Sequence, residues 1–181
     1  MRQASKWTLI GLLIWALASW GLAPTARSQL SLSAVIQETA RQLDLALQQS
    51  LLASSAPTLE NAQALSHQLL NLLEGQSGSD YDSRYPIAGD QLGLIEYASQ
   101  IEAGLQDARY QHRFDVTVDN IMIDFKLALA RTQQVLQLTA LGDTREKLNE
   151  TTAFLSAAKG RADDVPPLGG ILFLVAQIAQ P

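Results

Sequence analysis

Apolar residues recur at three- and four-residue steps through five successive segments, and this periodicity restricts the chain to helical folds. The segments are residues 31–53, 58–74, 91 to about 111, about 118–141 and 143–159. Pro57, Gly75, Gly142 and Gly160 interrupt the pattern between or after them. We therefore predict an all-α fold, namely an antiparallel four-helix bundle with an added fifth helix and an apolar C-terminal tail.

Residue types at the segment ends predict where the helices begin and end. Thr58 is a plausible N-cap and Gly75 a natural C-terminal residue for the second helix. Asp90 is predicted to cap the third helix, and 143–146 (Asp-Thr-Arg-Glu) resembles a capping box for the fifth. A turn is expected near 112–117; without it, the third and fourth helices would form one rod.

The first 28 residues have the layout of an export signal. A basic start precedes an uncharged apolar run over residues 7–23, and the small residues Ala26 and Ser28 follow. The alternative is a retained membrane anchor, because the run has 17 residues and Trp7 and Trp20 lie near its ends. We predict three parts: a signal peptide or anchor (1–28), a helical bundle domain (29–160), and a Pro/Gly linker with an apolar tail (161–181).

Composition restricts the function of the exported part. Without residues 1–28 the chain keeps 10 basic and 18 acidic residues, a net charge of −8. Such a domain is not expected to bind nucleic acid, and contact with a membrane is expected only if residues 7–23 are retained. The chain contains no Cys, which excludes disulfides, thiolate metal sites and Cys nucleophiles. No cofactor is predicted.

A long polar loop over residues 76–90 is the first candidate for binding a ligand or partner. Connections in helical bundles are usually about 2–8 residues long, so this length needs an explanation. The loop is rich in Asp, Gly and Tyr, and its candidate binding residues are Asp80, Tyr81, Asp82, Arg84, Tyr85 and Asp90.

The same loop holds weak candidates for a metal site. Asp80 and Asp82 open like a calcium loop, but Arg84 stands where an oxygen ligand belongs. An irregular site with Asp80, Asp82 and Asp90 is the remaining possibility. His67 is a further weak candidate, on a helix face predicted to be exposed with Glu60, Asn71 and Glu74. A solvated polar face is the more common explanation, so no metal is predicted.

The fourth helix carries apolar residues on two sides, which indicates a second partner. Ile123, Leu127 and Leu138 mark the reverse face as a candidate interaction surface. The apolar tail is expected to dock on this free face of the fourth helix and complete the core. The alternatives are a swapped segment, or contact with a partner or a membrane surface.

Three short stretches resemble a group of uncharacterised exported bacterial helical-bundle proteins. They are residues 71–75 (Asn-Leu-Leu-Glu-Gly), 78–82 (Gly-Ser-Asp-Tyr-Asp) and 89–97 (Gly-Asp-Gln-Leu-Gly-Leu-Ile-Glu-Tyr). The resemblance implies a helical fold and an exported location, and it implies no reaction.

The sequence contains no nucleophile motif, phosphate-binding motif or catalytic carboxylate pair. We therefore expect an exported, non-catalytic binding or assembly module that acts on a protein partner or by self-association. The alternatives are a periplasmic metal- or cofactor-binding bundle and a membrane-anchored sensor or complex subunit.

Overall fold

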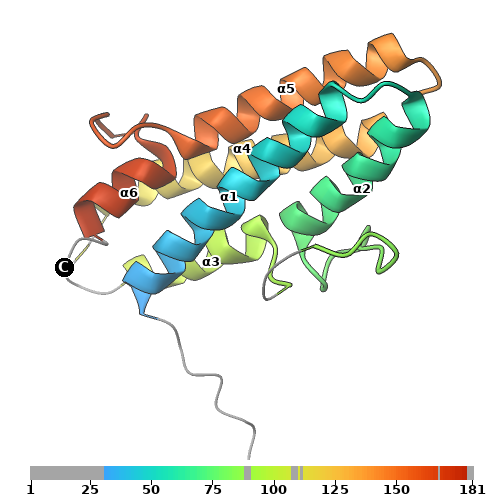
Figure 1. The fold of residues 1–181 in the computed structure, drawn as a ribbon. Helices are drawn as coiled ribbons and strands as arrows, with labels where there is room; N and C mark the ends of the chain where they lie inside the picture. The colour runs from blue at the N-terminus through green and yellow to red at the C-terminus, as the bar shows by residue number, and fades with distance from the viewer. Residues whose placement is uncertain (1–30, 88–90, 107–109, 111, 167, 179–181) are drawn as a thin grey trace, which may run out of the picture.

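The computed structural model describes residues 31–87, 91–106, 110, 112–166 and 168–178, which form six α-helices (Figure 1). The predicted all-α class is confirmed. The helices are α1 (Leu32–Ser54), α2 (Leu59–Glu74), α3 (Leu94–Leu105), α4 (Asp115–Val135), α5 (Leu141–Lys159) and α6 (Gly170–Ile178).

The helices form a bundle in which α2 and α3 share one corner. Both α1 and α4 pack against α2, α3 and α5, while α1 and α4 lie diagonally opposite each other. Figure 1 shows α2 and α3 following one another along the same side of the bundle. The predicted fifth helix is thus α5, and it occupies the fourth corner of the bundle instead of being an addition to it.

Two glycines allow α2 and α3 to share this corner. Gly75 ends α2 with φ +71°, and a Cβ there would lie 2.3 Å from the backbone nitrogen of Gly93. The backbone N–H of Gln76 donates a hydrogen bond of 2.8 Å to the carbonyl of Gln91. The chain therefore leaves the bundle at Gly75 and returns to it at Gly93, and the intervening loop is closed at its base.

Several predicted helix ends are confirmed. The hydroxyl of Thr58 accepts a hydrogen bond from the backbone of Asn61, so Thr58 caps α2 as expected. Gly75 and Gly160 are the C-caps of α2 and α5, both with positive φ. The third and fourth helices are separate as expected, but their limits differ: α3 ends at Leu105 instead of about residue 111, and α4 begins at Asp115, within the predicted turn 112–117.

Other helix ends were predicted wrongly. Helix α3 begins at Leu94 with Gly93 as its N-cap, because the chain returns to the bundle only there; Asp90 lies outside the described residues. Helix α4 ends at Val135, six residues before the predicted end, so Leu138 lies in the connection to α5.

The expected capping box at 143–146 is not formed, because α5 already begins at Leu141. Its N-cap is Ala140, whose carbonyl accepts hydrogen bonds from the backbone N–H and the hydroxyl of Thr144. Gly142 therefore lies in the first turn of α5 instead of ending the helix before it. The glycine is tolerated there because a short exposed turn needs little helix propensity.

The apolar tail forms α6 and completes the core, as expected. Ile171, Phe173 and Leu174 are buried. The predicted docking on the reverse face of α4 was wrong: the tail packs against α1, α5 and α4, while Ile123 and Leu127 on that face stay exposed. Within the described part of the chain, no helix is both long enough and apolar enough to cross a membrane. The predicted signal or anchor lies outside this part.

Candidate functional site

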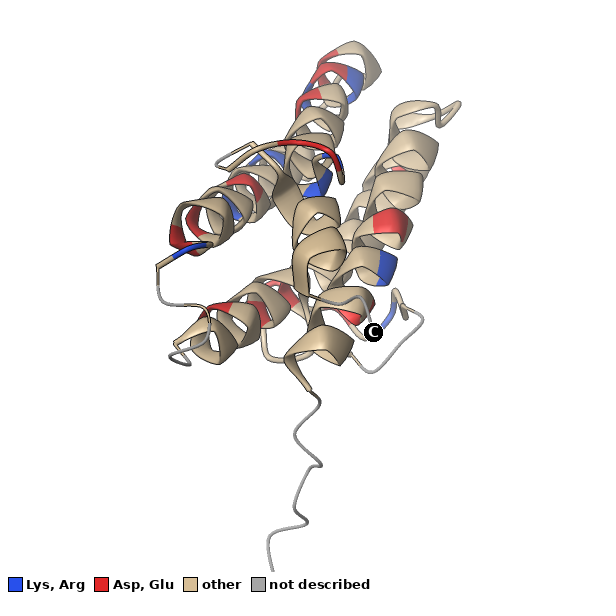
Figure 2. Cartoon of the chain, turned by 90° about the vertical axis from the view of Figure 1, so that its left-hand side faces the viewer, with Lys and Arg blue, Asp and Glu red and all other residues tan. Residues whose placement is uncertain are grey.

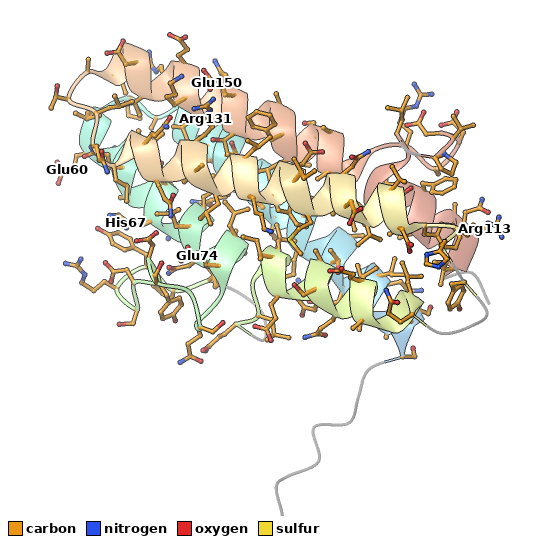
Figure 3. The ribbon with its side chains drawn as sticks, turned by 180° about the vertical axis from the view of Figure 1, so that it is seen from behind. Glu60, His67, Glu74, Arg113, Arg131 and Glu150 are labelled. Carbon is orange, nitrogen blue, oxygen red and sulfur yellow. The ribbon has the colours of Figure 1, made fainter. Side chains whose placement is uncertain are left out.

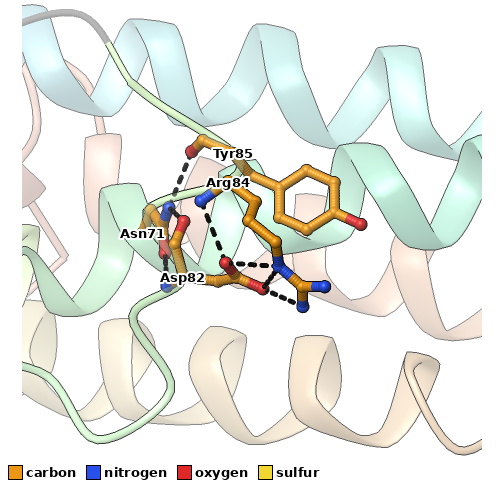
Figure 4. A network of polar contacts seen from close by, with 4 residues as sticks. All are labelled: Asn71, Asp82, Arg84 and Tyr85. Atoms are coloured by element: carbon orange, nitrogen blue, oxygen red, sulfur yellow. Dashed lines mark hydrogen bonds and ion pairs between the residues drawn. The ribbon is translucent and has the colours of Figure 1, made fainter.

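Asn71, on the side of α2 that the loop covers, holds the candidate loop in place. Its side-chain amide donates to the carbonyls of Asp82 and Tyr85 at 2.8 and 2.7 Å (Figure 4). Its side-chain oxygen accepts from the backbone N–H of Asp82 at 2.9 Å. Asn71 is 0% exposed, so its predicted place on a solvated face was wrong. The sequence pattern shows the polar side of α2 but not that a loop folds over it.

Asp82 and Arg84 form an ion pair within this loop. The Arg84 side chain donates from Nε and Nη2 to the two carboxylate oxygens, at 3.0 and 2.6 Å (Figure 4). The backbone N–H of Arg84 donates to the same carboxylate at 3.0 Å. These hydrogen bonds lower the pKa of Asp82 to about 2. The carboxylate thus stabilises the turn and has little capacity left for a metal.

His67 and Tyr85 stack face to face between α2 and the loop. Their ring centroids are 4.6 Å apart, with an interplanar angle of 7°. The expectation that His67 faces solvent was wrong: the residue is half-buried under Tyr85. Its Nδ1 has no hydrogen-bond partner among the described residues. Figure 3 shows His67 and Glu74 on the side of α2 that meets the loop.

Asp80 ties the loop to two helices. Its carboxylate accepts a hydrogen bond of 2.6 Å from the side chain of Gln133 on α4. Its backbone N–H donates to the Glu74 carboxylate at 2.8 Å. Tyr81 beside it is half-buried. The loop therefore lies against α4 as well as α2. The sequence pattern around Gln133 and Glu74 does not predict these two contacts.

The weak metal candidates do not form a ligand set. Asp80 is bonded to Gln133 and Asp82 to Arg84, while His67 stacks on a ring. Asp90 lies outside the described residues. No group of three or more potential metal ligands is found in the described ranges.

The outer face of α4 exposes large apolar side chains, as predicted for this helix. Val116, Ile123 and Leu127 are 56, 53 and 38% exposed. Leu138 does not belong to this face: it lies beyond the end of α4, half-buried, and its carbonyl accepts a hydrogen bond from Gln63. We call Val116, Ile123 and Leu127 the α4 stripe.

A second apolar surface lies in a shallow groove between α1 and α5. Leu51 and Leu52 are exposed there, and an ion pair of 2.7 Å between Asp44 and Lys159 lies on its rim. Acidic positions are otherwise spread over the helices and the linker instead of forming one cluster (Figure 2).

Comparisons of the chain with protein-family models, with curated proteins and with solved structures give no match. The chemistry of these surfaces therefore has to follow from their own geometry.

Proposed function

We propose that this protein is an exported, non-catalytic binding module that recognises a partner protein through the α4 stripe. The observation that carries the proposal is the exposure of three large apolar side chains in one line along α4. A line of exposed apolar side chains along one face of a helix is typical of a surface that a partner helix covers. The exported location follows from the pattern of residues 1–28, which lie outside the described part.

The shape of the stripe suits a single helix. At 100° per residue, Val116, Ile123 and Leu127 fall within an arc of about 40°. Their spacings of seven and four residues are those of a coiled-coil seam, in which one helix lays its apolar residues along another.

The charges beside the stripe favour a basic partner. Asp119 and the exposed Lys126 lie on one side of it and Asp124 on the other, and the chain as a whole carries a net charge of −5. We infer that the partner presents an amphipathic helix whose apolar residues are flanked by Lys or Arg. A second copy of this chain is a poorer fit, because it would add the same excess of acidic groups.

The loop supports a binding role without catalysis. Its polar side chains are used in contacts that hold it in shape, mainly the bonds of Asn71 and the Asp82–Arg84 pair. Through Gln133 the loop is fixed against the carboxyl-terminal part of α4.

The test is in-cell photocrosslinking of the full chain. A photoreactive amino acid replaces Ile123, and the matched control carries it in place of Val165, which is 66% exposed in the linker. We expect a discrete adduct from position 123 only. Mass spectrometry should place the crosslink in an amphipathic, Lys/Arg-rich helix of another protein.

Three results would refute the proposal. An adduct of twice the chain mass would mean self-association, and equal adducts from positions 123 and 165 would mean non-specific contact. The absence of any adduct from position 123 would mean that the stripe is not covered in the cell.

A further inference from the structure

A cavity of about 450 Å³ lies between the amino-terminal half of α4, the carboxyl end of α5 and the linker before α6. Thr117, Ile123 and Asp124 of α4 form one wall, and Arg161 and Leu168 belong to the opposite one. This volume is in the range of small-molecule sites, roughly 300–1,000 Å³.

Thr117 carries an unsatisfied hydroxyl in the wall of this cavity. The residue is 0% exposed, and its Oγ1 has no hydrogen-bond partner among the described residues. The buried threonines Thr39, Thr132, Thr144 and Thr151 each donate to the carbonyl four residues earlier. A buried hydroxyl without a partner is unfavourable, and because Thr117 is fully covered, a polar group in the cavity satisfies it only with a small shift of this wall.

Asp124 provides a negative charge without a counter-ion. Its side chain is half-buried, and no hydrogen bond or ion pair to it is found within the described ranges. Burial raises the pKa of this carboxyl. Arg161 does not compensate it, because its guanidinium is paired with Asp163 at 3.2 Å, and Asp164 further raises the pKa of Arg161.

The end of α5 adds to the negative potential of the cavity. Ser156, Ala157 and Gly160 line it, and they belong to the last turn and C-cap of that helix. Helix carboxyl ends carry a partial negative charge and favour cations.

We propose that this cavity binds a small organic cation with an ammonium or guanidinium group. The carboxylate of Asp124 is the counter-ion, and the hydroxyl of Thr117 accepts one N–H hydrogen bond. Ile123 and Leu168 contact the apolar part of the ligand. This site borders the α4 stripe and shares Ile123 and the flanking Asp124 with it, but its test needs the chain alone and no partner.

The experiment titrates the purified full chain with butylammonium and butylguanidinium by calorimetry, with butanol as the neutral isostere. The variants are Asp124→Asn and Thr117→Val, which keep the shape of each side chain. The matched control is Asp119→Asn, which removes an exposed acid from the same helix.

We expect saturable binding of at least one cation, and none of butanol. Asp124→Asn should raise the dissociation constant about tenfold or more, and Thr117→Val should raise it roughly threefold. Asp119→Asn should leave it unchanged. The affinity of the parent should rise with pH through the titration of Asp124, and this dependence should be lost in Asp124→Asn.

The proposal would be overturned if neither cation binds up to about 10 mM. It would also be overturned if butanol binds equally well, or if Asp119→Asn loses as much affinity as Asp124→Asn. Folding is checked by thermal melting, and because Asp124→Asn removes a poorly solvated charge, it should melt no lower than the parent.

Discussion

Replacing Asn71 by Leu tests whether this buried amide holds the loop onto the bundle. The change keeps a similar volume and removes all three hydrogen bonds to the backbone of Asp82 and Tyr85. A hydrogen bond contributes a net ~0.5–1.5 kcal/mol, so the three together contribute roughly 2–4 kcal/mol. The loss is expected at the lower end of this range, because a detached loop regains hydrogen bonds to water.

The assay is urea unfolding of the full chain, combined with amide hydrogen exchange at Asp82. With a slope of about 2 kcal/mol per M, a loss of about 2 kcal/mol should lower the midpoint by ~1 M. The backbone N–H of Asp82, which donates to Asn71, should lose its protection from exchange. The control Asn61→Leu changes an exposed residue on the same helix and should shift the free energy of unfolding by less than about 0.5 kcal/mol.

An unchanged midpoint together with unchanged protection at Asp82 would refute this reasoning. Lost protection with an unchanged midpoint would show that the loop detaches locally and contributes nothing to the stability of the bundle, which contradicts the predicted magnitude.

Four further predictions concern glycines and carboxylates. Gly75→Ala places a Cβ 2.3 Å from the Gly93 nitrogen at φ +71°, and thermal unfolding should show a loss of about 2 kcal/mol or more. Gly142→Ala, where a Cβ meets nothing within 4 Å, should instead stabilise by ~0.5–1 kcal/mol, and a loss there would contradict the account. The pKa of Asp82 is lowered to about 2, against about 3.9 in the unfolded chain, so its stabilising effect is present above pH ~4 and is lost as the pH falls through about 2. Urea midpoints from pH 2 to pH 5 should therefore depend less on pH in Asp82→Asn; an equal dependence would show that the ion pair is not formed. Burial raises the pKa of Asp124, so its charge costs stability above its unfolded pKa. Asp124→Asn should raise Tm at neutral pH, and the difference should vanish in acid, where both states are protonated. A difference that persists in acid would point to a cause other than charge.

Local sequence patterns predicted the helices and about half of their limits. Thr58, Gly75 and Gly160 act at helix ends where their residue types indicated, because capping depends on the backbone of one turn. The reverse face of α4 was also recognised, since Ile123 and Leu127 lie on one side of any helix with this sequence. The end of α4 and the start of α5 were misplaced, because the glycine that would break a helix lies in the first turn of the next one.

The sequence by itself determined the class of fold, since helical periodicity and the Gly and Pro breaks leave no comparable alternative. Only the tertiary structure decided the roles of the polar residues. Asn71 was expected in solvent, but the loop covers it, and His67 is covered by Tyr85 in the same way. Thr117 and Asp124 border a cavity only because the linker before α6 crosses α4. Periodicity shows which side of a helix is apolar. Burial of a polar group depends on what packs over the other side of the helix, and here the covering residues belong to the loop and the linker, outside the helix itself.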